Sequence, residues 1–256
     1  MSSLQYDDHV AAVTDAVEAF GVALADGPLN ARVPTCPDWD VAALAHHVGG
    51  FTGFWTHVIC DGLGTERTPY EEPPLSAGEN AVATWWSQTG AALIAALRAA
   101  SADTAVWTWS PSHQNAAFVA RRCAHELAVH RLDAQFARAT PEPIDAALAA
   151  DGIEEIFVMI EAWRSTESHA RGIFEGTGET LHLHGTDPGR SDEWLLTLSA
   201  DGLGVDRTHA KGDLAIRGAV ADLELVLYDR PPLGAVETFG DSAVLRTWKS
   251  RFFSFG

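Results

Sequence analysis

The densest group of side chains that could do chemistry lies within residues 121–134, which read RRCAHELAVHRLDA. Glu126 and His130 are four residues apart, so on a helix both side chains project from one face about one turn apart. A carboxylate and an imidazole at this spacing can reach one divalent metal ion, as they do in metal-binding helical bundles. The spacing also fits an ordinary surface pair that stabilises the helix by roughly a few tenths of a kcal/mol, and the pair alone leaves both interpretations open.

A pair of histidines, His46 and His47, offers a third ligand within the otherwise apolar segment 41–59. His47 borders the apolar stripe of this segment at helical spacing, whereas His46 falls on a different side. A histidine that points into a bundle needs a polar partner. A metal shared with Glu126 and His130 would supply that partner, and a backbone carbonyl would do so equally well.

Two neighbouring features agree with the metal interpretation. Asp133 follows His130 by three residues and can orient the second ring nitrogen of that histidine. The Gly49–Gly50 pair costs helix stability, about 1 kcal/mol per glycine relative to alanine, which indicates a close approach by a neighbouring helix or a ligand. Tight helix packing alone would explain the two glycines as well.

Other cysteines and histidines give weaker signals. Cys36, beside a predicted helix start, could be a nucleophile with a lowered pKa, but no base is identifiable near it and a structural role is favoured. Cys123, one turn before Glu126, could touch the metal, but a buried, inert thiol is favoured. His182 and His184 alternate with leucines on a predicted strand and share one face, where a polar strand face is favoured over a metal site.

Helices must position the candidate ligands, and apolar periodicity predicts five of them in the first two-thirds of the chain. Asp38 or Asp40 is expected to cap the second helix. Connections rich in proline and glycine separate the helices, a pattern that is typical of a helical bundle. The predicted helices cover residues 10–25, 41–59, 80–100, 116–138 and 144–164.

The pattern changes near residue 176, where alternating strands appear between turn signals. We therefore predict two domains, a helical bundle over residues 1–170 and a small α+β domain over residues 171–256. The predicted strands of the second domain are 180–184, 194–198 and 213–217, and its predicted helices are 219–228 and 242–252.

Composition excludes several classes of function. Of 256 residues, 35 are acidic and 17 basic, so the formal net charge is −18, which disfavours nucleic acids and anionic membranes as partners. No segment is apolar enough to cross a membrane, and the first residues lack the features of a targeting signal. Three sparse cysteines suit a reducing compartment, so we expect a cytoplasmic protein.

Two runs of sequence carry a resemblance to a known family. Residues 33–50, VPTCPDWDVAALAHHVGG, and 122–134, RCAHELAVHRLDA, resemble the mycothiol-dependent maleylpyruvate isomerase family. Residues 213–218, 222–230 and 239–241 are similar to parts of its C-terminal domain. The resemblance implies a DinB-like metal-binding helix bundle followed by a small sterol-carrier-like α+β domain.

The resemblance also implies which residues form the site. The family's first metal ligand precedes an apolar-Gly-Gly step, which matches His47 rather than His46, and the other ligands match Glu126 and His130. The metal is usually zinc. An arginine near the end of a C-terminal helix faces the active site in the family, and Arg230 occupies its place, although Tyr228-Asp229 replaces the commoner Trp-Gly.

Three protein ligands leave one coordination position open, as in catalytic zinc sites. A metal at such a position deprotonates a bound thiol, and the thiolate is the nucleophilic form. The resemblance therefore implies that mycothiol attacks a small electrophile, in an S-transferase or a cis–trans isomerase.

Two other functions remain open from the sequence. A thiol-independent zinc hydrolase would use the same ligands with bound hydroxide as the nucleophile. A non-enzymatic ligand-binding protein would use the metal only to stabilise the bundle. The electrophile, the choice among divalent metals and the oligomeric state are not determined by these residues.

Overall fold

The computed structural model describes residues 4–61, 66–67, 69–71, 79–166 and 175–252. The chain divides into two compact units, one spanning Leu4–Glu142 and the other beginning at Pro143. Each unit has its own core, and the two are considered separately below.

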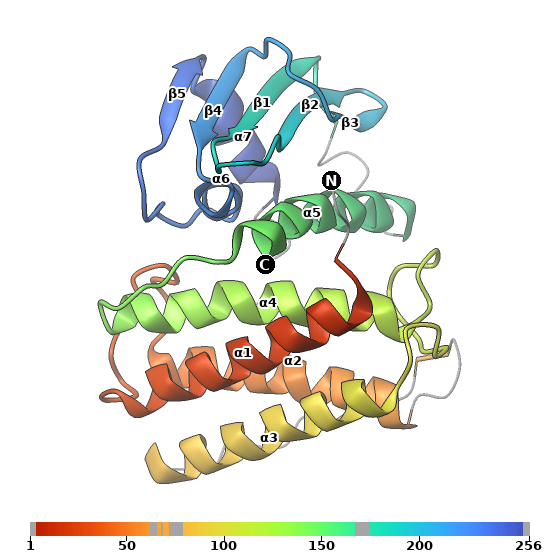
Figure 1. Cartoon of the computed structure of the whole chain (residues 1–256), viewed down its shortest axis with the longest axis vertical. Coiled ribbons are helices and arrows are strands. Elements are labelled where there is room, and N and C mark those ends of the chain that lie inside the picture. The colour runs from red at the N-terminus through yellow and green to blue at the C-terminus, as the bar shows by residue number, and fades with distance from the viewer. Residues whose placement is uncertain (1–3, 62–65, 68, 72–78, 167–174, 253–256) are drawn as a thin grey trace. The chain divides into compact units, whose positions relative to one another are not determined.

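The first unit is a bundle of four helices that run side by side (Figure 1). α1 and α2 each pack against both α3 and α4, so the four helices enclose one core. The helices are α1 (Tyr6–Ala25), α2 (Val41–Asp61), α3 (Glu79–Ala99) and α4 (Ala116–Ala137). The largest fully buried side chains of this core are Phe20, Leu44, Trp86, Leu93, Leu97, Leu127 and Leu132.

The two helices that carry the predicted ligands begin at side-chain caps. Asp40 accepts a hydrogen bond from the backbone N–H of Ala43 at 2.9 Å, which confirms one of the two predicted caps of α2. Asn115 accepts one from the N–H of Phe118 at 3.0 Å and caps α4. These caps set where each helix starts, and therefore which residues face the bundle.

The Gly49–Gly50 step of α2 serves two purposes. A Cβ atom at Gly49 would lie 1.8 Å from Cη2 of Trp85 on α3, so the missing side chain makes room for the indole ring. Gly50 instead lines a pocket next to the candidate ligands. Helix packing accounts for the first glycine, and the second is buried at the wall of the pocket.

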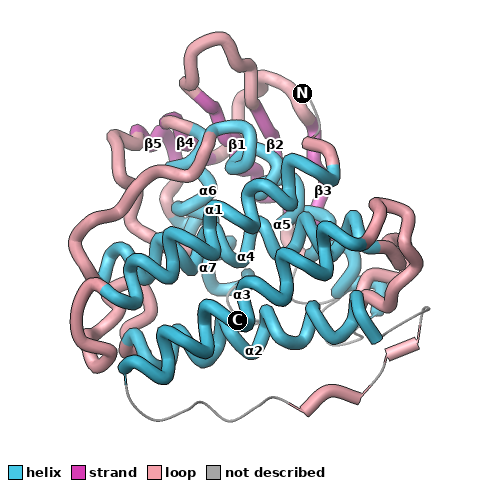
Figure 2. Tube along the Cα trace, turned by 60° about the horizontal axis from the view of Figure 1, so that its bottom comes forward, coloured by secondary structure: helices cyan, strands magenta, loops and turns pink. Residues whose placement is uncertain are grey.

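The second unit holds a five-stranded sheet in the order β3-β2-β1-β4-β5, which can be followed across Figure 2. β1 is parallel to β4, and every other neighbouring pair is antiparallel. The strands are β1 (Glu179–Gly185), β2 (Glu193–Ser199), β3 (Gly202–Asp206), β4 (Leu214–Gly218) and β5 (Glu237–Gly240). The helices are α5 (Ala146–Thr166), α6 (Val220–Leu227) and α7 (Ala243–Phe252).

Alternation along β1 gives the sheet two different faces. Leu181 lies opposite Leu196 of β2, and Leu183 lies opposite Trp194, and all four side chains are buried. α6 and α7 both contact β1, so an apolar layer forms between helices and sheet. The intervening residues of β1, His182 and His184, necessarily point to the other face.

The predicted fold class, a helical bundle followed by an α+β domain, is confirmed. All seven predicted helices and all three predicted strands are present, with ends shifted by a few residues. β3 and β5 were not predicted, because β3 contains Gly202 and Gly204 and the four residues of β5 are all exposed. Among the described helices, none is both long and apolar enough to cross a membrane.

α5 differs from the predicted organisation in one respect. It packs against α6 and β3 and therefore groups with the sheet, whereas the domain boundary near residue 170 assigns it to the helical bundle. The amphipathic pattern of a helix shows that one side is buried but not which neighbour covers it. The boundary at residue 170 stays a prediction about how the chain is organised into domains.

Candidate metal centre

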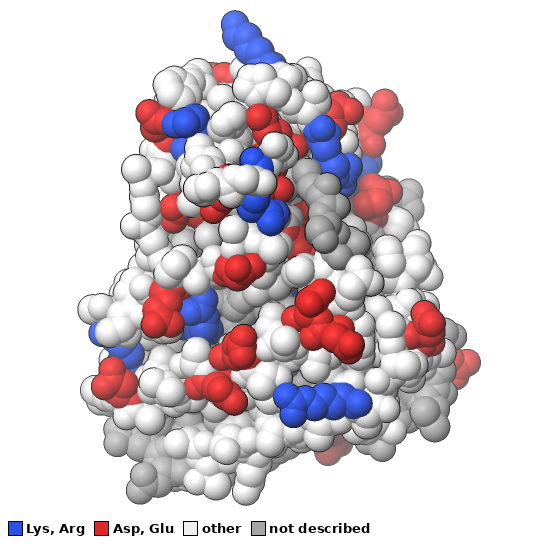
Figure 3. Space-filling view, in the orientation of Figure 1, with Lys and Arg blue, Asp and Glu red and all other residues white. Residues whose placement is uncertain are grey.

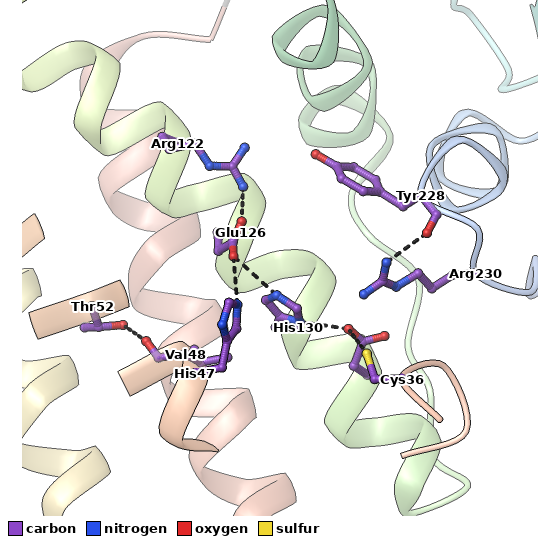
Figure 4. A network of polar contacts seen from close by, with 10 residues as sticks. Cys36, His47, Val48, Thr52, Arg122, Glu126, His130, Tyr228 and Arg230 are labelled. Carbon is purple, nitrogen blue, oxygen red and sulfur yellow. Dashed lines mark hydrogen bonds and ion pairs between the residues drawn. The ribbon is translucent and has the colours of Figure 1, made fainter. Parts of the chain in front are cut away.

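The three predicted ligands converge within the helical bundle. Oε1 of Glu126 lies 3.3 Å from Nε2 of His47 and 3.3 Å from Nε2 of His130. Figure 4 shows the carboxylate of Glu126 on α4 with both imidazoles turned toward it, one from α2 and one from α4. The three donor atoms all lie within 4.8 Å of one another. The i, i+4 spacing and the choice of His47 predicted residues that do lie together, and their role as metal ligands stays a prediction.

Arg122 fixes the orientation of Glu126. Its guanidinium pairs with Oε2 of Glu126 one helical turn away, and its own side chain is only 6% exposed. The second oxygen, Oε1, is left facing both histidines. This ion pair was not predicted, although the i, i+4 spacing of an arginine and a glutamate is a readable signal for it.

Asp133 fixes the orientation of His130 in the way expected from their spacing. Oδ2 of this fully buried carboxylate lies 2.8 Å from Nδ1 of His130, so Nδ1 donates its proton there and Nε2 faces Glu126. The thiol of Cys36 also donates to Oδ2 of Asp133, at 3.6 Å. Cys36 therefore supports the same carboxylate, which fits the structural role favoured for it over that of a nucleophile.

Charge accumulates strongly at this site. Burial alone would raise the pKa of Glu126, but the Arg122 guanidinium and hydrogen bonds from His130 and His47 outweigh it and hold that pKa well below its usual range. Burial likewise opposes protonation of His130, but the carboxylates of Asp133 and Glu126 outweigh it and raise the pKa of His130 to about 9. In the absence of metal, the site therefore holds an imidazolium beside a carboxylate.

His47 lies on the open side of the cluster. Its side chain is 40% exposed, against 20% for Glu126 and 11% for His130. The ring of Trp39 lies 4.8 Å from the ring of His47, centroid to centroid. A pocket adjoins His47, and its lining consists of Trp39, Ala42, Ala43, His46, His47, Gly50 and Phe51. A small molecule can thus approach the donors from this side.

The donor set fits a divalent metal. Two imidazole nitrogens and one carboxylate oxygen are ligands that zinc and other first-row metals share. The outer atoms of Glu126 and His130 are held by Arg122 and Asp133, as the outer atoms of metal ligands commonly are. Within the described part of the chain, this group comprises three donors, which leaves coordination capacity for a further ligand.

The remaining predicted residues lie outside this donor group. His46 lines the pocket, and Cys123 is fully buried in the bundle. Arg230 belongs to the second unit, where its Nη1 donates to the carbonyl oxygen of Tyr228 at 2.8 Å. The catalytic role of Arg230 stays a prediction.

Comparison with known proteins gives a matching family model and similar solved structures. Residues 10–135 match the family model described as the mycothiol maleylpyruvate isomerase N-terminal domain. A crystal structure of the mycothiol-dependent maleylpyruvate isomerase matches with a TM-score of 0.62 and 15% identity, covering 93% of this chain and 95% of that one. A crystal structure of a histidine-to-alanine variant of that enzyme matches with a TM-score of 0.59 and 15% identity, covering 88% and 91%. No curated protein matches the chain.

Proposed function

Residues 10–135 belong to the mycothiol maleylpyruvate isomerase N-terminal domain family. From this premise we propose that the protein is a metal-dependent enzyme. In the proposed reaction, mycothiol is the nucleophile and attacks a small electrophile. Its reaction is a cis–trans isomerisation or an S-transfer. The observation that carries the proposal is the convergence of two imidazole nitrogens on one oxygen of Glu126 beside an open pocket.

His47, Glu126 and His130 would hold the metal. When bound, zinc or another divalent metal supplies a Lewis acid that lowers the pKa of a thiol, so that thiolate is present at neutral pH. Arg122 keeps Oε1 of Glu126 turned toward the histidines, and Asp133 keeps Nε2 of His130 available as a ligand. The half-exposed ring of His47 provides the side from which substrates enter.

The thiol supplies the covalent chemistry of the isomerisation. The thiolate sulfur adds to one carbon of a cis double bond conjugated with a carbonyl, which forms a C–S bond and moves an electron pair to the carbonyl oxygen. The former double bond is then single and rotates. Loss of the sulfur restores the double bond in the trans geometry, so the thiol is regenerated and no redox change occurs.

S-transfer would begin with the same attack and end with loss of a leaving group from the electrophile. Arg230 is proposed to bind an anionic oxygen of the substrate, because a guanidinium pairs well with carboxylates and enolates. Both reactions use the same residues, so the electrophile distinguishes them.

The test is turnover by the zinc-loaded protein with maleylpyruvate, followed by NMR with and without mycothiol. We expect turnover only when metal and thiol are both present. His47→Ala and Glu126→Gln should lose metal and activity, whereas His57→Ala, which removes an imidazole later on α2, should retain both. Arg230→Ala should lower the turnover rate with unchanged metal content.

Other outcomes would support the other functions. Turnover of an electrophile without thiol would indicate a zinc hydrolase. Loss of stability on metal removal, with no reaction under any condition, would indicate a structural metal. Full metal occupancy in His47→Ala would contradict the assignment of the site.

A further inference from the structure

A second cluster of potential ligands lies in the second unit, on the face of the sheet that points away from the leucines. Nε2 of His182 lies 2.7 Å from Oε2 of Glu193, and Nδ1 of His184 lies 3.0 Å from Oε1. Nδ1 of His209 lies 2.8 Å from Oε2 of the same carboxylate. One donor atom from each of the four residues lies within 4.8 Å of the others.

Strand register places three members of this cluster. His182 and His184 are two residues apart on β1, so both point to one face. Glu193 of β2 is paired directly opposite His184 across the antiparallel ladder. This arrangement needs no side chain outside two neighbouring strands.

The segment 207–213 brings the fourth member from outside the ladder. Arg207 pairs with Glu154 of α5 at one end of the segment. Asp213 accepts hydrogen bonds from the backbone and the hydroxyl of Thr180 at the other end, at 2.9 and 2.8 Å. Both ends are thus fixed to the unit, and His209 between them is placed over β1 and β2.

The ring of His209 lies 5.2 Å from the ring of His182, centroid to centroid, and His182 is only 4% exposed. A Cβ atom at Gly212 would lie 3.0 Å from the backbone nitrogen of His182, so the end of the segment that leads into β4 runs close beside β1. His184 is 28% exposed and His209 is 74% exposed. The cluster therefore runs from a buried imidazole to an accessible one.

Three imidazoles around one carboxylate are more than an ion pair requires. The ring centroids lie 5.2–6.0 Å apart, and Glu193 carries one negative charge that can offset a single imidazolium. Three cations in this space would repel one another. Neutral imidazoles with converging nitrogens are, by contrast, the usual ligands of zinc and related metals.

We propose that His182, His184, Glu193 and His209 form a second divalent-metal site, of the zinc type. Four protein ligands close the coordination sphere, which is the mark of a structural rather than a catalytic site. A metal there fastens the segment 207–213 to β1 and β2. The site shares no residue with His47, Glu126 and His130 and does not depend on the proposed enzymatic function.

The test is a Zn²⁺ titration of the full-length metal-free protein, with metal content measured by mass spectrometry. We expect two equivalents for the unaltered protein and one for His47→Ala. His209→Ala should also bind one equivalent tightly, at the bundle site. Its zinc affinity at the sheet site should fall at least about 10-fold, because removing a residue that only hydrogen-bonds to a ligand already costs that much. Lys211→Ala, an exposed change in the same segment, should retain two equivalents.

His184→Ala provides a second variant, because this partly exposed side chain can be removed without opening the core. Co²⁺ in the His47→Ala background should give visible absorption that disappears on adding the His184→Ala change. Equal zinc affinity in His209→Ala and Lys211→Ala would overturn the proposal. Unchanged metal content in His184→Ala would also overturn it. If the bundle residues do not bind zinc but the sheet residues do, the unaltered protein binds one equivalent. That equivalent is lost in His209→Ala but not in His47→Ala.

Discussion

At the scale of single residues, the bundle site is notable for the partners behind its donors. Arg122 occupies the oxygen of Glu126 that does not face the histidines, and Asp133 occupies the nitrogen of His130 that does not face Glu126. Glu126 and His130 are therefore each held in one orientation before any metal binds. Preorganised donors bind more tightly because less freedom is lost on binding.

Asp133→Asn tests this orientation. An amide can present its NH₂ group to Nδ1 of His130, which would favour protonation at Nε2 and remove a lone pair from the site. We expect zinc affinity at the bundle site to fall about 10- to 100-fold, measured by competition with a chelator. Cys36→Ser keeps a donor to Asp133 and should bind zinc almost as the unaltered protein does. A large loss in Cys36→Ser alone would assign the thiol a direct role.

The raised pKa of His130 predicts opposite pH trends for stability and metal binding. Its pKa is about 9 in the folded, metal-free protein against an ordinary 6.5, so its stabilising effect is complete below about pH 6.5 and is lost as pH rises through 9. The lowered pKa of Glu126 has the opposite effect. It stabilises the fold above pH 4.5, the ordinary pKa of a glutamate, and this stabilisation is lost as pH falls below that value. The melting temperature in EDTA should therefore decline between pH 6.5 and 9.

Zinc affinity should rise over the same pH range, because His130 must lose its proton to become a ligand. Calorimetric titration at several pH values measures this trend, and proton release should accompany binding. His57→Ala should preserve both trends, and Asp133→Asn should flatten the decline in melting temperature. A melting temperature that rises from pH 6.5 to 9 in all three proteins would refute the assignment.

At the scale of elements, sequence patterns could place candidate residues where these lie on regular structure, whereas the choice of His47 over His46 came from the family resemblance. Helical periodicity placed Glu126 and His130 on one face, and alternation placed His182 and His184 on another. His209 was beyond such reasoning, since it lies in an irregular segment whose path is set by tertiary contacts rather than by a repeating pattern. The i, i+4 spacing of Arg122 and Glu126 would have allowed their ion pair to be predicted, but it was not predicted.

Gly240 of β5 illustrates a constraint that neither periodicity nor alternation reports. Its φ is +109°, and a Cβ atom there would lie 2.1 Å from the carbonyl oxygen of Asp213, which anchors the segment 207–213. Gly240→Ala should therefore lower the free energy of unfolding by about 2–4 kcal/mol, measured by urea denaturation.

Gly204 of β3 provides the matched control in the same sheet. A Cβ atom there would meet only Thr197, at 3.7 Å, which is an ordinary contact. Gly204→Ala should change stability little. Equal effects of the two substitutions would mean that the close approach to Asp213 relaxes without cost.

At the scale of the whole molecule, acidic residues dominate the charge, and Asp and Glu side chains are spread over the face shown in Figure 3. The proposed metals lie in different compact units, one in the helical bundle and one in the α+β unit. Each should therefore stabilise its own unit. At a free zinc concentration about 100 times a site's Kd, one site adds about 2.7 kcal/mol.

Hydrogen exchange after metal removal measures this division. EDTA should lower protection in α2 and α4 and, separately, in β1, β2 and the segment 207–213. His47→Ala should mimic only the first loss and His209→Ala only the second. Loss of protection throughout the chain in either variant would show that the units unfold together.

The pairing of β1 with β2 has a consequence for assembly of the chain. Histidines and leucines alternate along β1. A register shift of one residue relative to β2 would therefore turn His182 and His184 into the apolar core and expose the leucines of β1 to water. Cation capture would then fail together with core formation. Metal binding at this sheet, followed during refolding, should therefore report whether β1 and β2 have paired in the native register.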